Sequence, residues 1–182
     1  FKARGSDVSY TLNVDFLGAA LGTKTRVSLP DGRTLDVGVP PGTEDRQTLR
    51  LKGQGEPGMG GGPAGDAYVE IHIQPHAHFT RKDTDIHVEI PISLKEAVLG
   101  AKIMAPTIDG PVSLTVPKGS NTGTMLRLKG RGVVDRREGT RGDQYVKLKV
   151  VLPERPDAAL ERFVAGWDGG DGAVRDVQGF GK

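Results

Sequence analysis

Apolar and polar residues alternate with a period of two along much of the chain. The first clear run carries its apolar residues on one face: Tyr10, Leu12, Val14 and Phe16. A later run has the same form, with Ile86, Val88, Ile90 and Ile92. Such alternation is typical of a half-buried strand. Further strands are predicted at 25–29, 34–39, 47–52 and 67–74, and at about 102–107, 111–116, 124–129 and 144–152.

Two short helices are predicted between these strands. Ser93 and Glu96 form a capping box that opens one helix, which ends at Gly100. Asp15 takes the same capping position in the first part of the chain, and Gly22 is the corresponding stop.

A third helix is predicted near the C-terminus. It begins at Pro156-Asp157 and ends at Gly169-Gly170. Its apolar residues fall at i, i+3, i+4 and i+7 and so form one stripe: Leu160, Phe163, Val164 and Trp167.

Blocks of sequence recur in the same order, 77 or 78 residues apart. The matched pairs are 21–22 with 99–100, 31–32 with 109–110, 39–42 with 116–119, 49–55 with 126–132, and 65–69 with 142–146. Five co-linear matches make chance similarity improbable and indicate a duplicated module. A module of this size buries only about 60% of its unfolded surface, so we expect a rigid junction between the copies.

The repeat predicts a mainly β protein with two tandem homologous β-sandwich-like modules, short helices and a C-terminal helix. The predicted segments are a linker remnant at 1–5, the two modules at 6–75 and 76–153, and a tail at 154–182.

Composition narrows the chemistry. The 182 residues include 27 glycines and no cysteine. A chain without cysteine has no disulfide scaffold, thiolate zinc site or Cys nucleophile. The absence of cysteine fits a cytoplasmic location, which we expect. No apolar run approaches the ~20 residues of a membrane span, so no membrane association is expected. The chain starts on Phe and lacks the apolar core of a signal peptide, which indicates an excised fragment.

Candidate catalytic and metal-binding groups are few. His72, His76 and His78 are close in sequence, but no spacing places two of them on one helical face, which favours surface and junction histidines over a metal site. Asp83 and Asp85 lie in a polar turn, which favours a solvated turn over paired catalytic carboxylates. With no nucleophile–base pair in view, we expect no enzyme, no metal site and no cofactor.

A glycine-rich stretch resembles a nucleotide-binding loop only in its spacing. Residues 53–58 match G-x-G-x-x-G, but that motif needs a helix that opens at its third glycine. Here Met59 and more glycines follow. The stretch 55–65 is instead predicted to be a mobile hairpin loop in which nothing can pack.

Charge is distributed unevenly. Residues 1–75 carry 8 basic and 9 acidic groups, whereas residues 76–153 carry 13 basic and 8 acidic groups. The second copy could neutralise phosphates with Arg127, Lys129, Arg131, Arg136, Arg137 and Arg141. Aromatic residues that would stack on bases are nearly absent there. A solvated charged face is the favoured interpretation, and non-specific nucleic-acid contact is the alternative.

One apolar face has two interpretations. Alternate residues of three predicted strands share it if those strands are neighbours: Tyr10, Leu12, Val27, Leu29 and Val69. Either these residues are simply core, or they form a shallow hydrophobic groove beside a sheet edge. Such a groove can take an extended peptide by strand addition, with pockets for alternate side chains.

Several runs also carry a family resemblance. They are 12–22, 39–43, 49–55, 65–69, 76–81, 90–100, 126–132 and 142–146, and the match extends over about 6–165. Together they resemble the C-terminal substrate-binding region of DnaJ-type co-chaperones. The resemblance implies two similar β-domains in series, clients bound in a hydrophobic depression on the first, and a C-terminal segment that pairs two chains.

By position, the depression of that family falls on Tyr10, Leu12, Val27, Leu29 and Val69, with Thr25 at its rim. The pairing segment falls on the stripe of the predicted C-terminal helix. The resemblance also implies that unfolded client polypeptides pass to a DnaK-type ATPase chaperone.

The resemblance is to the zinc-free subtype. The zinc-finger subtype inserts a cysteine-rich module between two strands of the first domain, where this sequence has only Pro30-Asp31-Gly32. The sequence is therefore similar to the CbpA branch, and the J-domain that stimulates the ATPase is missing from it. We expect the fragment to hold clients without driving the ATPase cycle. The alternative is CbpA-like nucleic-acid binding through the basic second module.

Overall fold

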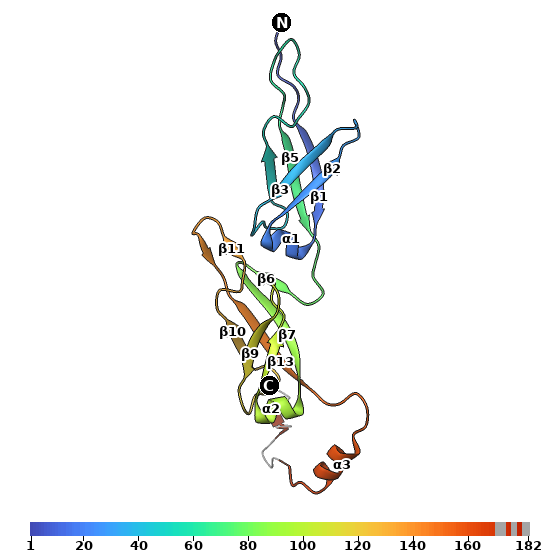
Figure 1. Cartoon of the computed structure of the whole chain (residues 1–182), viewed down its shortest axis with the longest axis vertical. Coiled ribbons are helices and arrows are strands. Elements are labelled where there is room, and N and C mark those ends of the chain that lie inside the picture. Colours follow the sequence, from blue (N-terminus) through green and yellow to red (C-terminus); the bar gives the residue numbers. More distant parts are fainter. Residues whose placement is uncertain (170–173, 176–177, 180–182) are drawn as a thin grey trace. The chain divides into compact units, whose positions relative to one another are not determined.

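The computed structural model describes residues 1–169, 174–175 and 178–179 (Figure 1). The chain divides into two compact units, 1–150 and 151–182, and the first unit holds both sequence repeats. Strands dominate, so the mainly β, sandwich-like fold class is confirmed. The boundaries of the two predicted modules and of the tail stay predictions.

The first repeat forms two layers around one core. Its elements are β1 (Val8–Val14), α1 (Phe16–Leu21), β2 (Thr23–Ser28), β3 (Thr34–Val39), β4 (Thr48–Leu51) and β5 (Ala67–Ile73). One sheet has the order β1-β5-β4, with β1 parallel and β4 antiparallel to β5. The β2–β3 hairpin forms the other layer. Alternate residues of both layers make up the core, as the period of two predicted.

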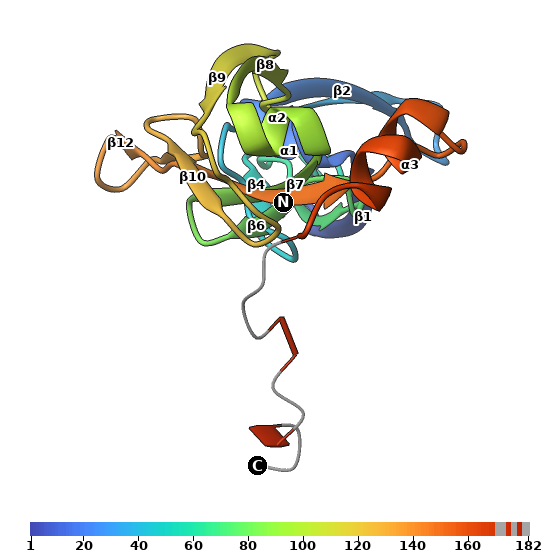
Figure 2. The same ribbon diagram turned by 90° about the horizontal axis from the view of Figure 1, so that it is seen from below.

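The second repeat has the same arrangement of strands and helix, with additional short strands. Its elements are β6 (Thr80–Lys82), β7 (Asp85–Ser93), α2 (Leu94–Leu99), β8 (Ala101–Ala105), β9 (Val112–Val116), β10 (Met125–Leu128), β11 (Val134–Asp135), β12 (Thr140–Arg141) and β13 (Gln144–Val151). The main sheet has the order β10-β13-β7-β6. Figure 2 shows the β8–β9 hairpin as a separate layer, with α2 across the end. The short β6, β11 and β12 escaped prediction because none is long enough to show alternation.

Both predicted helix caps are confirmed. The Asp15 carboxylate accepts the N–H of Gly18 at the start of α1 (3.2 Å). Ser93 and Glu96 form the reciprocal capping box of α2, with bonds of 2.9 and 3.1 Å. Each cap satisfies N–H groups that the first helical turn leaves free.

The C-terminal helix is shorter than predicted. α3 (Ala158–Ala165) begins after Asp157, whose side chain accepts a backbone N–H of the first turn (3.0 Å). It ends at Gly166, whose N–H donates to the carbonyl groups of Phe163 and Val164 in the last turn. Trp167 therefore lies beyond the helix, although the stripe was predicted to include it. Gly170, where the helix was predicted to end, lies outside the described residues.

The glycine-rich loop at 55–65 is packed, so the expectation that nothing in it can pack is wrong. Residues 1–6 run along it, and Ala3 and Met59 exchange two backbone hydrogen bonds (2.9 and 3.0 Å). A Cβ on Gly62 would collide with the carbonyl of Ala3. The absence of side chains is what lets two backbones approach this closely.

A buried aspartate joins the strands of the first sheet. The Asp66 carboxylate accepts the N–H of Gly53, just after β4 (2.9 Å), and two bonds from the Arg50 guanidinium (2.8 and 3.0 Å). The N–H of Asp66 donates to the Asp7 carboxylate, just before β1 (2.7 Å). The pKa of Asp66 is lowered, first by the Gly53 hydrogen bond and then by Arg50.

The second repeat has the same arrangement around Asp143. Its carboxylate accepts the N–H of Gly130 (2.7 Å) and a bond from Arg127 (2.7 Å), and its own N–H donates to Asp85 (2.8 Å). The Gly130 hydrogen bond is the main cause that lowers the pKa of Asp143, and Arg127 adds to it. The repeat seen in the sequence thus reappears as a repeated hydrogen-bond node.

The two repeats contact each other directly. Arg81 of β6 donates to the backbone carbonyls of Thr43 (2.9 Å) and Gly42 (3.1 Å) in the turn after β3. A Cβ on Gly42 would collide with the carbonyl oxygen of Val134 in β11. Ala20 of α1 is part of the core of the second repeat.

The Asp66 node predicts a pH-dependent loss of stability in Asp66→Asn. A lowered folded pKa contributes stability above the ordinary value of 3.8, and this contribution is lost as the pH falls through the folded pKa. We expect Asp66→Asn to unfold at a lower urea concentration than the native chain at pH 7. The difference should shrink as the pH falls below 3.8 and through the lowered pKa of the folded Asp66 carboxylate, where the native chain takes up the proton.

Urea unfolding monitored by circular dichroism across this pH range measures the effect. Asp36→Asn is the matched control, because Asp36 forms an exposed ion pair with Arg26 (2.9 Å) that contributes little. A loss for Asp66→Asn that is the same at every pH would contradict the assigned role.

The junction predicts that Gly42→Ala is more damaging than Gly119→Ala. Both glycines have φ near +80° (82° and 77°), so both substitutions carry about 1 kcal/mol of left-handed strain. Only Gly42 faces a backbone carbonyl, whereas Gly119 faces open space, and we expect the collision to add about 1–3 kcal/mol. Chemical denaturation of both variants measures the difference, and equal losses would show that the junction contact is loose.

Candidate functional site

The first repeat is open along one side. Tyr10 and Leu12 of β1, and Val27 of β2, point toward the core but are only half-buried. Their register partners on the adjacent strands are more deeply buried: Val69 of β5 beside Tyr10 is 1% exposed, and Leu35 of β3 beside Val27 is 4% exposed. In the part of the chain that the structure describes, β1 pairs only with β5 and β2 only with β3. The open side is therefore an apolar strip between two strands that each have an unpaired edge.

The predicted groove residues divide into two groups. Tyr10, Leu12 and Val27 pack against the core from the open side. Thr25 lies two residues before Val27 on the same face of β2 and is also half-buried. Leu29 and Val69 are buried core residues, with 7% and 1% exposure, so they support the strip from below instead of lining it. Register places Tyr10 directly beside Val69.

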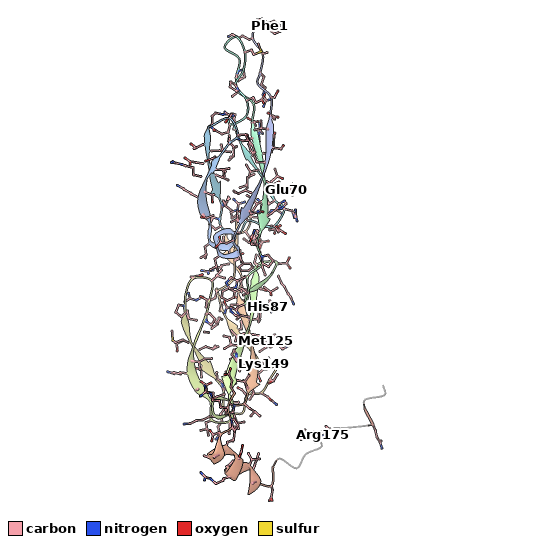
Figure 3. The ribbon with its side chains drawn as sticks, turned by 90° about the vertical axis from the view of Figure 1, so that its right-hand side faces the viewer. Phe1, Glu70, His87, Met125, Lys149 and Arg175 are labelled. Carbon is pink, nitrogen blue, oxygen red and sulfur yellow. The ribbon has the colours of Figure 1, made fainter. Side chains whose placement is uncertain are left out.

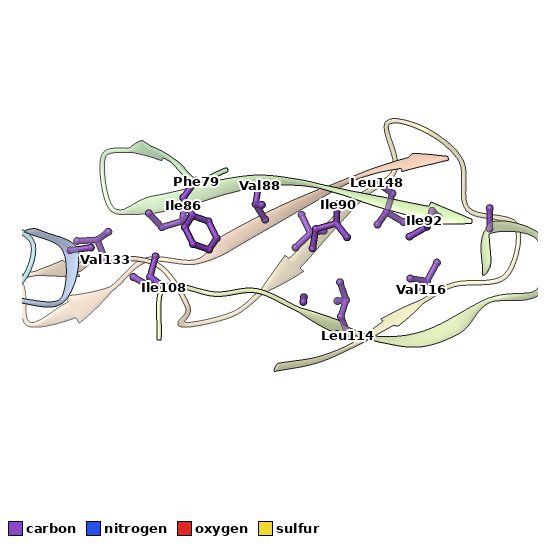
Figure 4. Packing of buried hydrophobic residues seen from close by; sticks show 14 residues of the cluster. Phe79, Ile86, Val88, Ile90, Ile92, Ile108, Leu114, Val116, Val133 and Leu148 are labelled. Carbon is purple, nitrogen blue, oxygen red and sulfur yellow. The ribbon is translucent and has the colours of Figure 1, made fainter. Parts of the chain in front are cut away.

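The same positions of the second repeat are closed. Val88 and Ile90 lie 78 residues after Tyr10 and Leu12, and they are 5% and 8% exposed. Figure 4 shows three further side chains gathered at the end of this core near Ile86: Phe79, Ile108 and Val133.

We call these three side chains of the second repeat, Phe79, Ile108 and Val133, its plugs. The first repeat has no counterpart of them. At the positions that correspond by the 77- and 78-residue offsets it has Phe1, Pro30 and Glu56. All three are exposed, and Figure 3 shows Phe1 at the tip of the glycine-rich loop. A hollow of about 370 Å³ lies beside two of these positions, Pro30 and Glu56, and is lined by Val8, Ser9, Tyr10, Pro30, Asp31, Arg33 and Glu56.

The rim of this hollow is polar and held in place. Arg33 donates to the Asp31 carboxylate (2.6 Å) and to the carbonyl of Gly55 (3.2 Å). The pKa of Asp31 is lowered, first by the backbone N–H of Arg33 and then by its guanidinium. Neither Arg33 nor Glu56 was predicted from the sequence. The signal for Glu56 is its place in the repeat, since it corresponds to the apolar Val133 of the second copy.

The basic residues of the second repeat are partly neutralised. They are Arg127, Lys129, Arg131, Arg136, Arg137 and Arg141. Arg127 pairs with Asp143 (2.6 Å), and both Arg131 (3.5 Å) and Arg141 (2.6 Å) pair with Asp109. Within the described ranges the remaining three form no ion pair within 4.0 Å: Lys129, Arg136 and Arg137. Nucleic-acid contact stays a prediction.

The stripe of the tail lies on the surface of its own unit. Phe163, Val164 and Trp167 are 63%, 50% and 58% exposed, and Leu160 is half-buried. The rings of Phe163 and Trp167 stack with centroids 5.9 Å apart. Pairing of two chains through this stripe stays a prediction. Of the helices described, none has both the length and the apolar character needed to cross a membrane.

The similarity of this chain to known proteins extends over both repeats. The family described as "DnaJ C terminal domain" matches residues 8–153. The "Curved DNA-binding protein" of Coxiella burnetii (strain RSA 493 / Nine Mile phase I) is 42% identical over 167 residues, which is 85% of this chain and 52% of that protein. "Chaperone protein DnaJ 2" of Mycolicibacterium paratuberculosis is 47% identical over 129 residues, or 71% of this chain and 33% of that protein.

"Chaperone protein DnaJ" of Ruminiclostridium cellulolyticum is 45% identical over 123 residues, or 68% of this chain and 32% of that protein. The chain thus spans about half of the length of the first of these curated relatives and about a third of the length of the other two. The family match covers both repeats, including the open strip and its closed counterpart. The chain therefore belongs to the DnaJ C-terminal domain family.

Proposed function

We propose that the open side of the first repeat binds extended, unfolded client polypeptides. A client segment would lie as an added strand in the apolar strip between β1 and β2, with alternate side chains on Tyr10, Leu12 and Val27 and with Thr25 at the rim. The single observation that carries the proposal is the missing set of plugs. The repeat that closes its core with Phe79, Ile108 and Val133 leaves no such strip, whereas the first repeat leaves a hollow.

Two kinds of interaction would hold the client. The unpaired backbone groups of an edge strand can bond to an added strand, and the half-buried apolar side chains can take alternate residues of the client. Ordering a flexible peptide offsets much of this gain, so we expect affinities of about micromolar or weaker.

The role of the whole protein follows the family. We propose that the client is passed to a DnaK-type ATPase chaperone in the cytoplasm and that the chain belongs to the zinc-free branch, since it has no cysteine. We also propose that Leu160, Phe163, Val164 and Trp167 pair two copies of the chain, because an exposed apolar stripe favours burial against a second surface.

Val27→Asp tests the strip. Val27 points inward and Ser28 outward on the same strand, so Ser28→Asp is the matched control. We expect Val27→Asp to abolish binding of a fluorescent peptide with alternating large apolar residues, measured by anisotropy, because a carboxylate in the strip repels apolar side chains. Ser28→Asp should bind as the native chain does.

Glu56→Val keeps the test decisive if Val27→Asp fails to fold. This variant restores one of the plugs of the second repeat, so it should weaken peptide binding while it keeps or raises thermal stability. Unchanged peptide binding by a folded Glu56→Val would contradict the proposed binding strip, whether or not Val27→Asp folds.

A second candidate function is non-specific DNA binding through the second repeat. Two observations favour it: the Coxiella burnetii relative is a "Curved DNA-binding protein", and Lys129, Arg136 and Arg137 form no ion pair in the described ranges. We expect any such binding to fall steeply with salt, because it depends on counterion release.

Reversing Arg136 and Arg137 to Glu should then abolish binding to duplex DNA in gel-shift or anisotropy titrations at low salt. Reversing Lys24 and Lys52 is the control, since both are exposed basic residues of the first repeat and form no ion pair within the described ranges. Equal effects of the two double variants would mean that the charge of the whole chain matters and the second repeat does not.

A further inference from the structure

One histidine holds the turn that leads from the first repeat into the second. The ring of His76 folds back over its own turn, and its Nδ1 accepts the backbone N–H groups of His78 (3.0 Å) and Phe79 (3.1 Å). Among the described residues no other hydrogen bond satisfies either N–H. Both bonds need an unprotonated Nδ1, so the proton of the neutral ring lies on Nε2.

The turn positions side chains that join the two repeats. Phe79 is buried in the core of the second repeat, and its ring stacks with that of Phe16 in α1, with centroids 6.4 Å apart. Arg81, two residues further on, donates to the carbonyl of Thr43 in the first repeat (2.9 Å). The His76 ring contacts both phenylalanine rings, with centroids 5.7 Å from Phe16 and 4.7 Å from Phe79. The two hydrogen bonds of His76 therefore fix a turn on which contacts with both repeats depend.

Protonation would reverse the role of Nδ1 in this turn. An imidazolium carries an N–H donor at each nitrogen, so Nδ1 would present a third donor to the two backbone donors. Both hydrogen bonds would be lost, and two N–H groups beside the core would be left without an acceptor. The bonds therefore stabilise the turn above the pH at which His76 takes up a proton, and this stabilisation is lost as the pH falls through that point.

The other groups around His76 act in both directions. Carboxylates and the faces of the two phenylalanine rings attract a cation, whereas guanidinium groups, a lysine and the His78 ring (6.0 Å) oppose it. The helix α1 itself carries no charged side chain. The charged residues of the elements around the ring are, on the acidic side, Asp15, Glu44, Asp45, Asp83 and Asp135 and, on the basic side, Arg46, Arg81, Lys82, Arg136 and Arg137. The two signs balance, so the hydrogen bonds of Nδ1 decide the direction of the effect.

We propose that His76 makes the junction between the two repeats sensitive to pH: the neutral ring locks the turn, and the protonated ring releases it. Histidine is the side chain whose charge changes between about pH 5 and 8, whereas an ordinary carboxylate stays ionised there. Release of the turn frees Phe79 and Arg81 from their fixed positions, so the two repeats should move relative to each other in acid. The inference does not depend on the proposed client binding, because no residue of the open strip takes part in it.

Two dyes report the motion of the junction. The chain has no cysteine, so Ser28→Cys/Ser113→Cys supplies one label in each repeat, both at exposed strand positions. Time-resolved FRET then measures the width of the distance distribution between the dyes at about pH 7.5 and about pH 5. We expect a narrow distribution at neutral pH and a broader one in acid. An unchanged width would overturn the proposal, and a narrower one would show that the rings hold the imidazolium instead.

Substitutions in the labelled chain separate the acceptor from the charge. The side-chain oxygen of Asn accepts backbone N–H groups just after it in the chain and does not titrate, so His76→Asn should keep the distribution narrow at both pH values. His76→Ala, which has no acceptor, should be broad at both. His78→Asn is the matched control, because it removes an exposed imidazole that accepts neither bond, and it should broaden in acid as the native chain does. A loss of the acid effect in His78→Asn would assign the effect to the wrong ring and contradict the proposal.

The native chain provides a test that needs no substitution at His76. The ¹⁵N chemical shifts of its imidazole should show the proton on Nε2 at neutral pH. The pH at which this ring ionises should also coincide with the midpoint of the FRET change. A proton on Nδ1 at neutral pH, or a clear separation of the two midpoints, would overturn the proposal even if the His76 variants fail to fold.

Discussion

A buried carboxylate at the same place in each repeat holds the main sheets together. Asp66 and Asp143 each bind a turn N–H and an arginine, and each donates its own N–H to a carboxylate at the start of a neighbouring strand. One residue thereby fixes the ends of three strands at once. Such a buried charge is stable only because all of its partners are present.

The proposed client binding depends on a difference between the two repeats. The shared nodes, caps and hairpins give both repeats the same plan, so the fold alone does not distinguish them. What differs is the set of side chains at one end of the core. Phe79, Ile108 and Val133 close the second repeat, and Phe1, Pro30 and Glu56 leave the first repeat open. A duplicated module can thus keep one copy as a stable support and use the other as a binding surface.

The segment 76–81 serves the second repeat and the junction together. Phe79 completes the core of the second repeat, His76 caps the turn beside it, and Arg81 reaches back to the carbonyls of Thr43 and Gly42. Phe79, His76 and Arg81 also line a hollow of about 470 Å³ where the two repeats meet. A short run that resembles a family motif in the sequence is therefore explained by the contacts that join one repeat to the other.

The sequence by itself determined the mainly β fold, the two helix caps and the internal repeat, because alternation, capping and duplication are properties of neighbouring residues. It also placed Tyr10, Leu12 and Val27 on one face. It could not decide that Leu29 and Val69 lie beneath that face, or that backbone of residues 1–6 fills the glycine-rich loop. Nor could it show the hollow at Glu56 or the hollow beside Phe16 and Phe79. These features depend on which strand lies at an edge and on contacts between residues far apart in the chain, and only the tertiary structure decides them.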